Sequence, residues 1–435
     1  MVEGDSGMTT ERLRVYGYTL GCRLNACETE AILDGLTGLC AQVERTDVPE
    51  EADVIVVNTC AVTGRSQARS RKAVRALARR NPDAVIAVTG CVAEISPDDF
   101  DPRDVLVVPN SDKPGLVGTL AARCGIAASS PPGAGEGFFP VSAPASTART
   151  RAFLKVQDGC DGRCTYCVVP LARGRSKSQH RERVLEQAEA LRGNGYREIV
   201  LTGIDLAAYG RDLYGGDYGL PELVRDLLRE GGFRLRLSSL EPLFLGSDLL
   251  AGLALPGLCR HFHVPVQSGS DRILGAMGRR YGREELERLL ESFEKHFPGA
   301  AVGADFIVGF PGEGEEDFRA TMELASDPRI AYLHVFPFSP RPGTAAWDMG
   351  GRVHPETVSE RAVALRKRSA ESRRRFRRSQ LGTEALALVE GRMHRGRLVG
   401  LTDNYIPLLA PEGSTEGSLV RIESLTEDMV CWELR

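Results

Sequence analysis

The sequence has no apolar run of the roughly 20 residues that a membrane-spanning helix needs, which excludes a membrane-embedded protein. It also lacks an excess of positive charge. The formal net charge of the 435 residues is −4, so a nucleic-acid partner must bind a local basic patch. Residues 1–14 contain acidic side chains but no apolar core, unlike a secretory signal peptide. We therefore expect a soluble, cytoplasmic protein without a membrane partner.

The sequence also lacks the pattern of a disulfide-stabilised protein. Its 11 cysteines belong to a chain of 435 residues, whereas disulfide frameworks are typical of short secreted chains. We expect free thiols in a reducing compartment, some of them kept for metal binding. A chain of this length typically has about three domains. Hydrophobic residues make up 42% of it, which is enough to form sizeable cores.

Three cysteines lie close together in the segment Cys160-Asp-Gly-Arg-Cys164-Thr-Tyr-Cys167. Three thiolates can hold three irons of a four-iron cluster and leave the fourth iron open to a small molecule. The alternative is a zinc knuckle, but zinc sites usually pair two cysteines with two further cysteines or histidines. No histidine lies at ligand spacing, since the nearest is His180. The pattern therefore favours an iron–sulfur cluster over zinc.

The segment 10–124 alternates short apolar strands with amphipathic helices such as 66–80, which predicts an open parallel α/β domain. Strands are expected at 14–20, 53–57 and 84–88, and a cysteine follows each of them: Cys22, Cys60 and Cys91. Loops after parallel strands meet at one edge of the sheet, so these cysteines can form a second three-thiolate site. The alternative is three unrelated buried cysteines, because free cysteine is often buried.

The other cysteines lack such a context, and we interpret them as packing residues: Cys27, Cys40, Cys124, Cys259 and Cys431. From 125 to 149 the chain is rich in Ala, Ser, Pro and Gly, which is typical of a linker.

The segment 150–380 predicts a second α/β domain. Helices are expected at 181–192 and 283–296, between six strands at 153–157, 198–201, 235–239, 262–266, 303–308 and 331–336. Six βα units indicate a partial (β/α)6 barrel, with its chemistry at the carboxyl ends of the strands.

A basic helix at 361–378 closes this segment, and 381–435 has the short strands and turns of a small β-barrel. The candidates for RNA contact on the helix are Arg373, Arg374, Arg375, Arg377 and Arg378. A second basic run lies on the helix predicted at 66–80. For either run, the alternative is a solvated helix face, the commoner meaning of a charge run.

The Cys160 motif, with Tyr166 before its last cysteine, resembles that of the radical S-adenosylmethionine enzymes. The resemblance implies a [4Fe-4S] cluster whose open iron chelates S-adenosylmethionine, with Cys160, Cys164 and Cys167 as ligands. Further cofactor contacts are expected at Tyr166 and at the strand ends: Thr202, Gly203, Asp205, Ser239, Glu241, Gln267, Asp305, Ile307 and Gly309. For any one of these residues alone, the alternative is a structural turn beside a core strand.

Two three-cysteine sites with a small terminal β-domain resemble the methylthiotransferases. Residues 19–30, 156–160 and 170–176 are most similar to the branch that acts on threonylcarbamoyladenosine in tRNA, and 381–435 resembles the TRAM RNA-binding barrel. The resemblance implies that Cys22, Cys60 and Cys91 hold an auxiliary [4Fe-4S] cluster. It also implies methylthio insertion at C2 of the base at position 37, a reductant protein and a sulfur donor as partners, and a monomer.

Two other functions remain open. The same chemistry could act on isopentenyladenosine in tRNA or on an aspartate of a ribosomal protein, although the residues around Cys22 favour neither. The chain could instead be a non-enzymatic iron–sulfur protein that binds RNA or senses redox state, but such a sensor needs no cofactor-binding strand ends.

Overall fold

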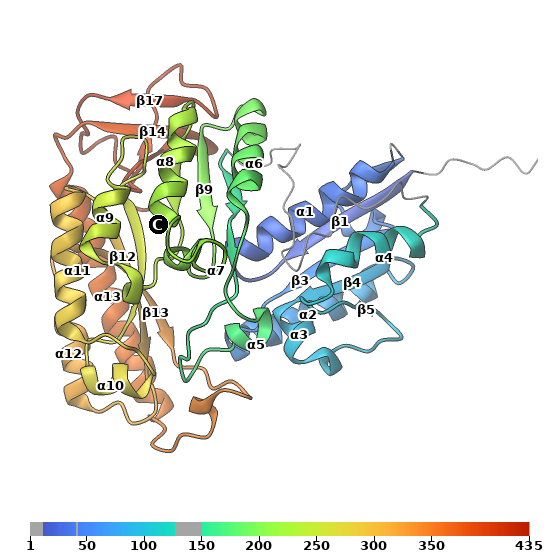
Figure 1. The fold of residues 1–435 in the computed structure, drawn as a ribbon, viewed down its shortest axis with the longest axis horizontal. Coiled ribbons are helices and arrows are strands. Elements are labelled where there is room, and N and C mark those ends of the chain that lie inside the picture. The colour runs from blue at the N-terminus through green and yellow to red at the C-terminus, as the bar shows by residue number, and fades with distance from the viewer. Residues whose placement is uncertain (1–11, 41, 127–149, 435) are drawn as a thin grey trace, which may run out of the picture. The chain divides into compact units, whose positions relative to one another are not determined.

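The computed structural model describes residues 12–40, 42–126 and 150–434 (Figure 1). The chain forms two compact units. Of the described residues, those up to 126 together with Leu171–Arg173 form the N-terminal unit, and 150–170 and 174–434 form the C-terminal unit. Most of the predicted linker at 125–149 lies outside the described residues. No helix in the described ranges is both long and apolar enough to cross a membrane.

The N-terminal unit is an open, entirely parallel five-stranded sheet. Its strand order is β2 (Val43–Arg45), β1 (Leu13–Thr19), β3 (Val54–Thr59), β4 (Val85–Gly90) and β5 (Leu106–Val107). The central strand β3 is wholly buried, as its continuous run of β-branched residues predicts. The helices are α1 (Arg23–Leu39), α2 (Gly64–Arg80), α3 (Cys91–Ile95) and α4 (Leu116–Arg123). The predicted open α/β fold is confirmed.

The C-terminal unit contains six parallel strands in two hydrogen-bonded groups of three. The first group is β6 (Ala152–Lys155), β9 (Glu198–Thr202) and β10 (Arg234–Leu237), and the second is β11 (His261–Gln267), β12 (Ala301–Val308) and β13 (Ile330–Pro337). Single parallel bridges, Leu235 to Leu258 and Ser239 to His263, join the two groups. The strands thus form one curved sheet, which confirms the predicted partial (β/α)6 barrel.

Helices pack along the outside of this curved sheet (Figure 1). They are α6 (Arg181–Gly193), α8 (Leu220–Glu230), α9 (Ser247–Leu253), α10 (Asp271–Ala276), α11 (Arg283–His296), α12 (Glu315–Ala325) and α13 (Pro355–Ser379). Shorter elements are β7 (Gln157–Asp158), α5 (Val169–Arg173), β8 (Lys177–Ser178) and α7 (Arg211–Tyr214). On β11, the buried ring of Phe262 packs on Phe293 and Phe297 at centroid distances of 4.9 and 4.5 Å. Because side chains alternate along a strand, its neighbour His263 faces the inside of the barrel.

The chain ends in a four-stranded antiparallel sheet, as expected for a small β-domain. Its order is β16 (Pro407–Leu409), β15 (Arg397–Thr402), β14 (Ala385–His394) and β17 (Leu419–Ile422). Its own core includes the buried side chains of Ala387, Ile406 and Leu408.

Two buried arginines of β10 fasten this sheet to the barrel. Arg234 donates to the carbonyl oxygen of Leu401 at 2.8 Å, and Arg236 donates to that of Asp403 at 2.9 Å. Both guanidinium groups also donate to the buried carboxylate of Glu198, at 2.7 and 2.8 Å. Burial raises the pKa of Glu198, but the two arginines outweigh it and hold the pKa at about 2. The carboxylate is therefore ionised and offsets two buried cations.

Candidate active site

The first three-cysteine site lies in the loop between β7 and α5; we call it the loop site. Backbone N–H groups approach two of its sulfurs: Gly162 N lies 3.2 Å from Cys160 Sγ, and Val169 N lies 3.4 Å from Cys167 Sγ. Hydrogen bonds of this kind favour thiolates and tune iron–sulfur clusters. The loop is held in place by Thr165, whose N and Oγ1 both donate, at 2.9 Å, to the carbonyls of Met277 and Ala276.

A cavity of about 650 Å³ opens beside the loop site within the C-terminal unit. Cys160 and Cys164 belong to its wall, and so do two of the predicted cofactor contacts, Asp205 and Glu241. Its lining includes the basic residues Arg163, Arg175, Lys177, Arg211, Arg279 and Arg280, and the apolar or aromatic residues Leu243, Phe244 and Tyr281. The cavity places a small-molecule site directly against two thiols of the loop site.

Arg279 is the best-anchored cation of this cavity. Its guanidinium donates at 2.6 Å to the carboxylate of Glu241 and at 2.6 Å to the hydroxyl of Tyr166. Burial raises the pKa of the Cys164 thiol, while the positive charge of Arg279 opposes that rise. Tyr166 and Glu241, both predicted cofactor contacts, therefore position a cation beside the loop site.

Asp205 fits a cationic ligand. Its Oδ1 is buried and, within the described ranges, has no hydrogen-bond partner. Burial, followed by repulsion from Glu241, raises the pKa of Asp205 to about 7. A buried acceptor without a partner in a cavity wall matches an ammonium group such as the amino group of S-adenosylmethionine.

The remaining predicted cofactor contacts lie elsewhere in the C-terminal unit and are absent from the lining of this cavity. Thr202 is buried and its hydroxyl donates to the carbonyl of Val200 at 3.2 Å. Gly203 N donates to Ser238 Oγ at 3.2 Å, and Ile307 packs against a small apolar cluster around Phe310.

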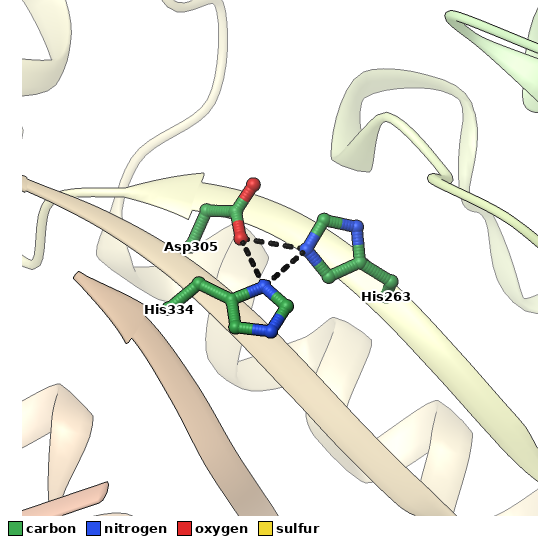
Figure 2. Close-up of side chains that lie close together, drawn as sticks. All are labelled: His263, Asp305 and His334. Carbon is green, nitrogen blue, oxygen red and sulfur yellow. Dashed lines mark hydrogen bonds and ion pairs between the residues drawn. The ribbon is translucent and has the colours of Figure 1, made fainter. Parts of the chain in front are cut away.

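Three more of these contacts have local structural roles. Gly309 has a φ of +76°, and a Cβ there would lie 2.4 Å from Val358 on α13, so close packing already requires glycine. Gln267 is buried at the end of β11 with a φ of 73°. Asp305 belongs to a histidine cluster on the inner side of the barrel (Figure 2), and Ser239 Oγ lies 2.8 Å from Nδ1 of His263 in that cluster.

The second three-cysteine site lies in the N-terminal unit; we call it the strand-end site. Cys22 precedes α1, Cys60 directly follows β3, and Cys91 begins α3 directly after β4. Asn25 joins two of these loops, because its Nδ2 donates to the carbonyls of Leu20 at 2.8 Å and Thr59 at 3.0 Å. The predicted convergence of Cys22, Cys60 and Cys91 on one sheet edge is what the parallel topology produces.

Two glycines allow this convergence. Gly21 has a φ of +99°, and a Cβ on it would lie 2.7 Å from Cys60 Cβ. Gly90 has a φ of +96°, and a Cβ on it would lie 2.4 Å from Asn58 Oδ1 and 2.5 Å from the backbone of Thr59. Side chains at these positions would push the cysteine-bearing loops apart.

Buried charges accompany the strand-end site. Glu28 accepts from Lys113 Nζ at 2.6 Å and from Arg173 Nη1 at 3.0 Å, and all three side chains are almost fully buried. Arg173 and Lys113 also counteract the rise that burial causes in the pKa of Cys91. Like the loop site, the strand-end site thus has fixed positive charge close to its thiols.

Neither three-cysteine site has the close thiol spacing of a preassembled single-metal site. In tetrahedral zinc sites with Zn–S bonds of about 2.3 Å, sulfurs are roughly 3.8 Å apart. Across the described residues, the one His/Cys/Asp/Glu group whose ligand atoms all lie within 4.8 Å of one another contains no cysteine. A larger cluster, in which each thiolate binds a different iron, fits this wider spacing.

The protonation of the thiols points the same way. Burial raises the pKa of Cys60 and of Cys160 to about 11, and that of Cys167 to about 12. Buried thiols become thiolates when a bound metal supplies the compensating positive charge. Both donor sets therefore suit a cationic cluster.

The predicted RNA-contacting arginines of α13 divide into two groups. Arg377 is buried and donates to the carbonyls of Cys431 and Leu434 at 3.1 and 2.6 Å, and burial lowers its pKa to about 10. Its prediction as a phosphate ligand is therefore wrong, because it fastens the end of the chain. Arg373 stacks on Tyr332, whereas Arg374, Arg375 and Arg378 are exposed, although Arg375 also donates to the carbonyl of Asp327.

Sequence reasoning missed several residues of the site. Arg279, Arg280 and Tyr281 follow a short helix rather than a strand, so the strand-end rule does not reach them. His263 and His334 lie within strands β11 and β13, where the rule also gives no signal. Of the other cysteines, Cys27, Cys259 and Cys431 are buried, and Cys40 and Cys124 are half-buried.

Known proteins resemble this chain over nearly its full length. Residues 154–325 match the Radical SAM superfamily, and residues 14–107 match the Uncharacterized protein family UPF0004. The threonylcarbamoyladenosine tRNA methylthiotransferase MtaB of Bacillus subtilis is 37% identical over 424 residues, covering 94% of this chain and 93% of that protein. This chain belongs to the radical S-adenosylmethionine methylthiotransferase family.

Other members of the family and more distant structures agree. The proteins of the same name from Thermotoga maritima and Aquifex aeolicus are 33% and 35% identical over 95% and 94% of this chain, and over 95% and 100% of their own lengths. The solved structure of the methyltransferase TsrM from Kitasatospora setae, with cobalamin and a [4Fe-4S] cluster bound, has a TM-score of 0.53 at 16% identity. It covers 78% of this chain and 77% of its own, and at that identity it supports the fold alone.

Proposed function

We propose that this methylthiotransferase modifies tRNA, inserting a methylthio group at C2 of N6-threonylcarbamoyladenosine at position 37, next to the anticodon. The observation that carries the proposal is the pair of three-cysteine sites, one in each unit, in a chain that aligns over 94% of its length with a relative named for this activity. The N-terminal unit, which holds the strand-end site, would supply the sulfur insertion. The barrel, which holds the loop site, would supply the radical.

Cys160, Cys164 and Cys167 would hold a [4Fe-4S] cluster that binds S-adenosylmethionine, and Cys22, Cys60 and Cys91 an auxiliary [4Fe-4S] cluster. When bound, these groups supply a radical that can take hydrogen from an unactivated C–H bond, with the sulfur and methyl group that replace it. No acid or base among the side chains can activate an aromatic C–H bond in water, so the protein's part is positioning.

The residues of the cavity are suited to that positioning. Asp205 offers a buried acceptor to an ammonium group, and Arg279, fixed by Glu241, holds positive charge beside Cys164. Leu243, Phe244 and Tyr281 provide apolar wall that excludes water from a bound nucleoside. Because the target base is stacked in RNA, it must leave its stack to reach such a cavity.

Local patches of positive charge support an RNA substrate, although the net charge of the whole chain is negative. Six Lys or Arg residues line the cavity against four Asp or Glu residues. On α2, Arg65, Arg69, Lys72, Arg75 and Arg79 are exposed, and the exposed Arg374 and Arg378 remain candidates on α13. Binding through phosphates predicts a steep loss of affinity with salt.

The finer assignments belong to the same proposal. Residues 10–124 would form the sulfur-inserting domain, 150–380 the radical domain and 381–435 the TRAM-like RNA-binding domain. The protein would act in the cytoplasm as a monomer, with a reductant protein and a sulfur donor as partners.

Mass spectrometry of tRNA nucleosides from a deletion strain tests the substrate. We expect loss of 2-methylthio-N6-threonylcarbamoyladenosine, restored by the wild-type gene but not by a gene with all three loop-site cysteines changed to Ala. Retention of that nucleoside with loss of the isopentenyl derivative, or of a modified ribosomal aspartate, would assign the alternative substrate. If the reduced, reconstituted protein formed no 5′-deoxyadenosine from S-adenosylmethionine, the non-enzymatic alternative would stand instead.

A further inference from the structure

Three neighbouring strands of the barrel bring two histidines and one aspartate together on its inner side. They are His263 on β11, Asp305 on β12 and His334 on β13 (Figure 2). Asp305 Oδ1 lies 2.6 Å from His263 Nε2 and 3.1 Å from His334 Nδ1, and the two ring nitrogens are 3.3 Å apart. Figure 2 shows these three atoms facing one another at the corners of a small triangle. In the described chain, this is the one group with metal-ligating atoms so close together.

The size of this triangle matches metal coordination. With ligand bonds of about 2.0–2.2 Å, neighbouring ligand atoms in tetrahedral or octahedral sites are roughly 3.0–3.4 Å apart. The three distances of 2.6, 3.1 and 3.3 Å lie close to that range. An ion could bind on the open side of the triangle after small side-chain adjustments, without a change of strand register. The pleat and pairing of β11, β12 and β13 already fix the directions of the side chains.

The surroundings supply the support that metal-binding histidines usually have. His263 Nδ1 lies 2.8 Å from Ser239 Oγ, so the hydroxyl can accept a hydrogen bond from Nδ1–H, and in that tautomer Nε2 has a lone pair for a metal ion. His263 and Asp305 are largely buried, whereas the His334 side chain is 50% exposed, so one side of the cluster is open to solvent.

We propose that His263, Asp305 and His334 bind one divalent transition-metal ion, in a site separate from both cysteine sites. Two imidazoles and one carboxylate on one side of an ion are a donor set used for iron, manganese, cobalt and zinc, with further positions open to oxygen ligands. The site shares no residue with the lining of the cavity beside the loop site. Ser239, two residues before the cavity residue Glu241, connects the two regions along the chain.

Binding of Mn²⁺ to the full-length protein with its clusters assembled and oxidised tests the proposal. Room-temperature electron paramagnetic resonance counts free Mn²⁺, and occupied cysteines do not compete for this hard ion. We expect one Mn²⁺ site per chain, from which Zn²⁺ displaces the manganese. Asp305→Asn and His263→Gln should abolish the site. Ser239→Ala should weaken it about 10- to 100-fold through the lost support of His263.

Two controls keep the result interpretable. His180→Gln removes an exposed histidine far along the chain from the cluster and should leave the Mn²⁺ site intact. His334→Gln changes the most exposed ligand, so it should lose the ion yet keep the wild-type circular dichroism spectrum and melting temperature. If wild-type protein binds neither Mn²⁺ nor Zn²⁺ at a site that these substitutions remove, the cluster is a hydrogen-bond network only and the proposal is wrong.

Discussion

The loop site and the strand-end site each contain three cysteines, but the two sets of thiols are brought together in different ways. In the loop site the thiols are close in sequence, and backbone N–H groups of the same short segment approach two of the sulfurs. In the strand-end site they come from three loops between residues 22 and 91, and they meet only because β1, β3 and β4 are parallel neighbours. A local segment can preserve the first site, whereas the second depends on the whole sheet. Substitutions that disturb the sheet should therefore affect metal binding at the strand-end site more than at the loop site.

The largest expected effect follows from changing Cys160, Cys164 and Cys167 together to Ala. Without these ligands we expect no reductive cleavage of S-adenosylmethionine, so 5′-deoxyadenosine should fall below detection in an anaerobic chromatographic assay. The variant should melt close to the wild-type temperature, because the three cysteines are only half-buried and do not belong to the buried hydrophobic core. Cleavage at the wild-type rate would show that the loop is not the cofactor site.

The matched change at the strand-end site should separate the two functions. With Cys22, Cys60 and Cys91 changed to Ala, we expect 5′-deoxyadenosine to form while methylthio insertion into tRNA is lost, as measured by nucleoside mass spectrometry. Cys27→Ala is the control, because Cys27 lies on α1 close to Cys22 but is buried in the core. Insertion that survives in the triple variant would contradict the assignment of an auxiliary cluster.

Each unit contains a buried carboxylate that pairs with two cations, so the effects of removing its charge can be compared between the two units. Glu28→Gln leaves Lys113 and Arg173 buried beside the strand-end site, and Glu198→Gln leaves Arg234 and Arg236 buried under the terminal sheet. Each change should cost about 3–5 kcal/mol in the free energy of unfolding, measured as a shift of the denaturant midpoint. Only Glu28→Gln should also reduce iron content, since Glu28 pairs with Lys113 and Arg173, whose positive charges act on the Cys91 thiol.

The exposed pair of Glu189 and Arg192 provides the control for both changes. Glu189→Gln should alter the free energy of unfolding by less than about 1 kcal/mol. If Glu198→Gln were equally mild, the buried network would not be what fastens the terminal sheet.

Glycine substitutions test the dependence of the strand-end site on the sheet. Gly90→Ala forces a Cβ to within 2.5 Å of the Thr59 backbone at a φ of +96°, so we expect a loss of about 1–3 kcal/mol and less iron at that site. Gly118→Ala on α4 meets no atom within 4 Å and should be neutral or slightly stabilising. Calorimetry and iron analysis of both variants check this. Equal iron contents would show that the loops tolerate displacement.

The last expected effect concerns acid. Because the folded pKa of Glu198 is about 2, below its ordinary value, its ion pairs stabilise the fold fully above about pH 4.5. That contribution is lost as the pH falls from about 4.5 toward 2. The wild-type melting temperature should therefore fall more steeply over this range than that of Glu198→Gln. Parallel curves for the two proteins would contradict the ionised state of Glu198.

The features that could be predicted from the sequence are those set by neighbouring residues, whereas features set by tertiary contacts could not be predicted. The loop site, the strands and the order of the βα units depend on neighbouring residues, and the predicted strands differ from the observed ones by only a few residues. Arg279 and His334 could not be found in this way, because their roles depend on side chains brought near by tertiary packing. Arg377 was mistaken for a surface cation because a charge run does not show which of its members faces the core.

Iron and sulfide content tests the central claim of two separate clusters most directly. We expect roughly eight irons and eight sulfides per reconstituted wild-type chain, and about four of each in either triple-cysteine variant. Each variant should keep the spectrum of one [4Fe-4S] cluster. Full iron content in the Cys22, Cys60 and Cys91 variant, or about four irons in the wild type, would contradict the account.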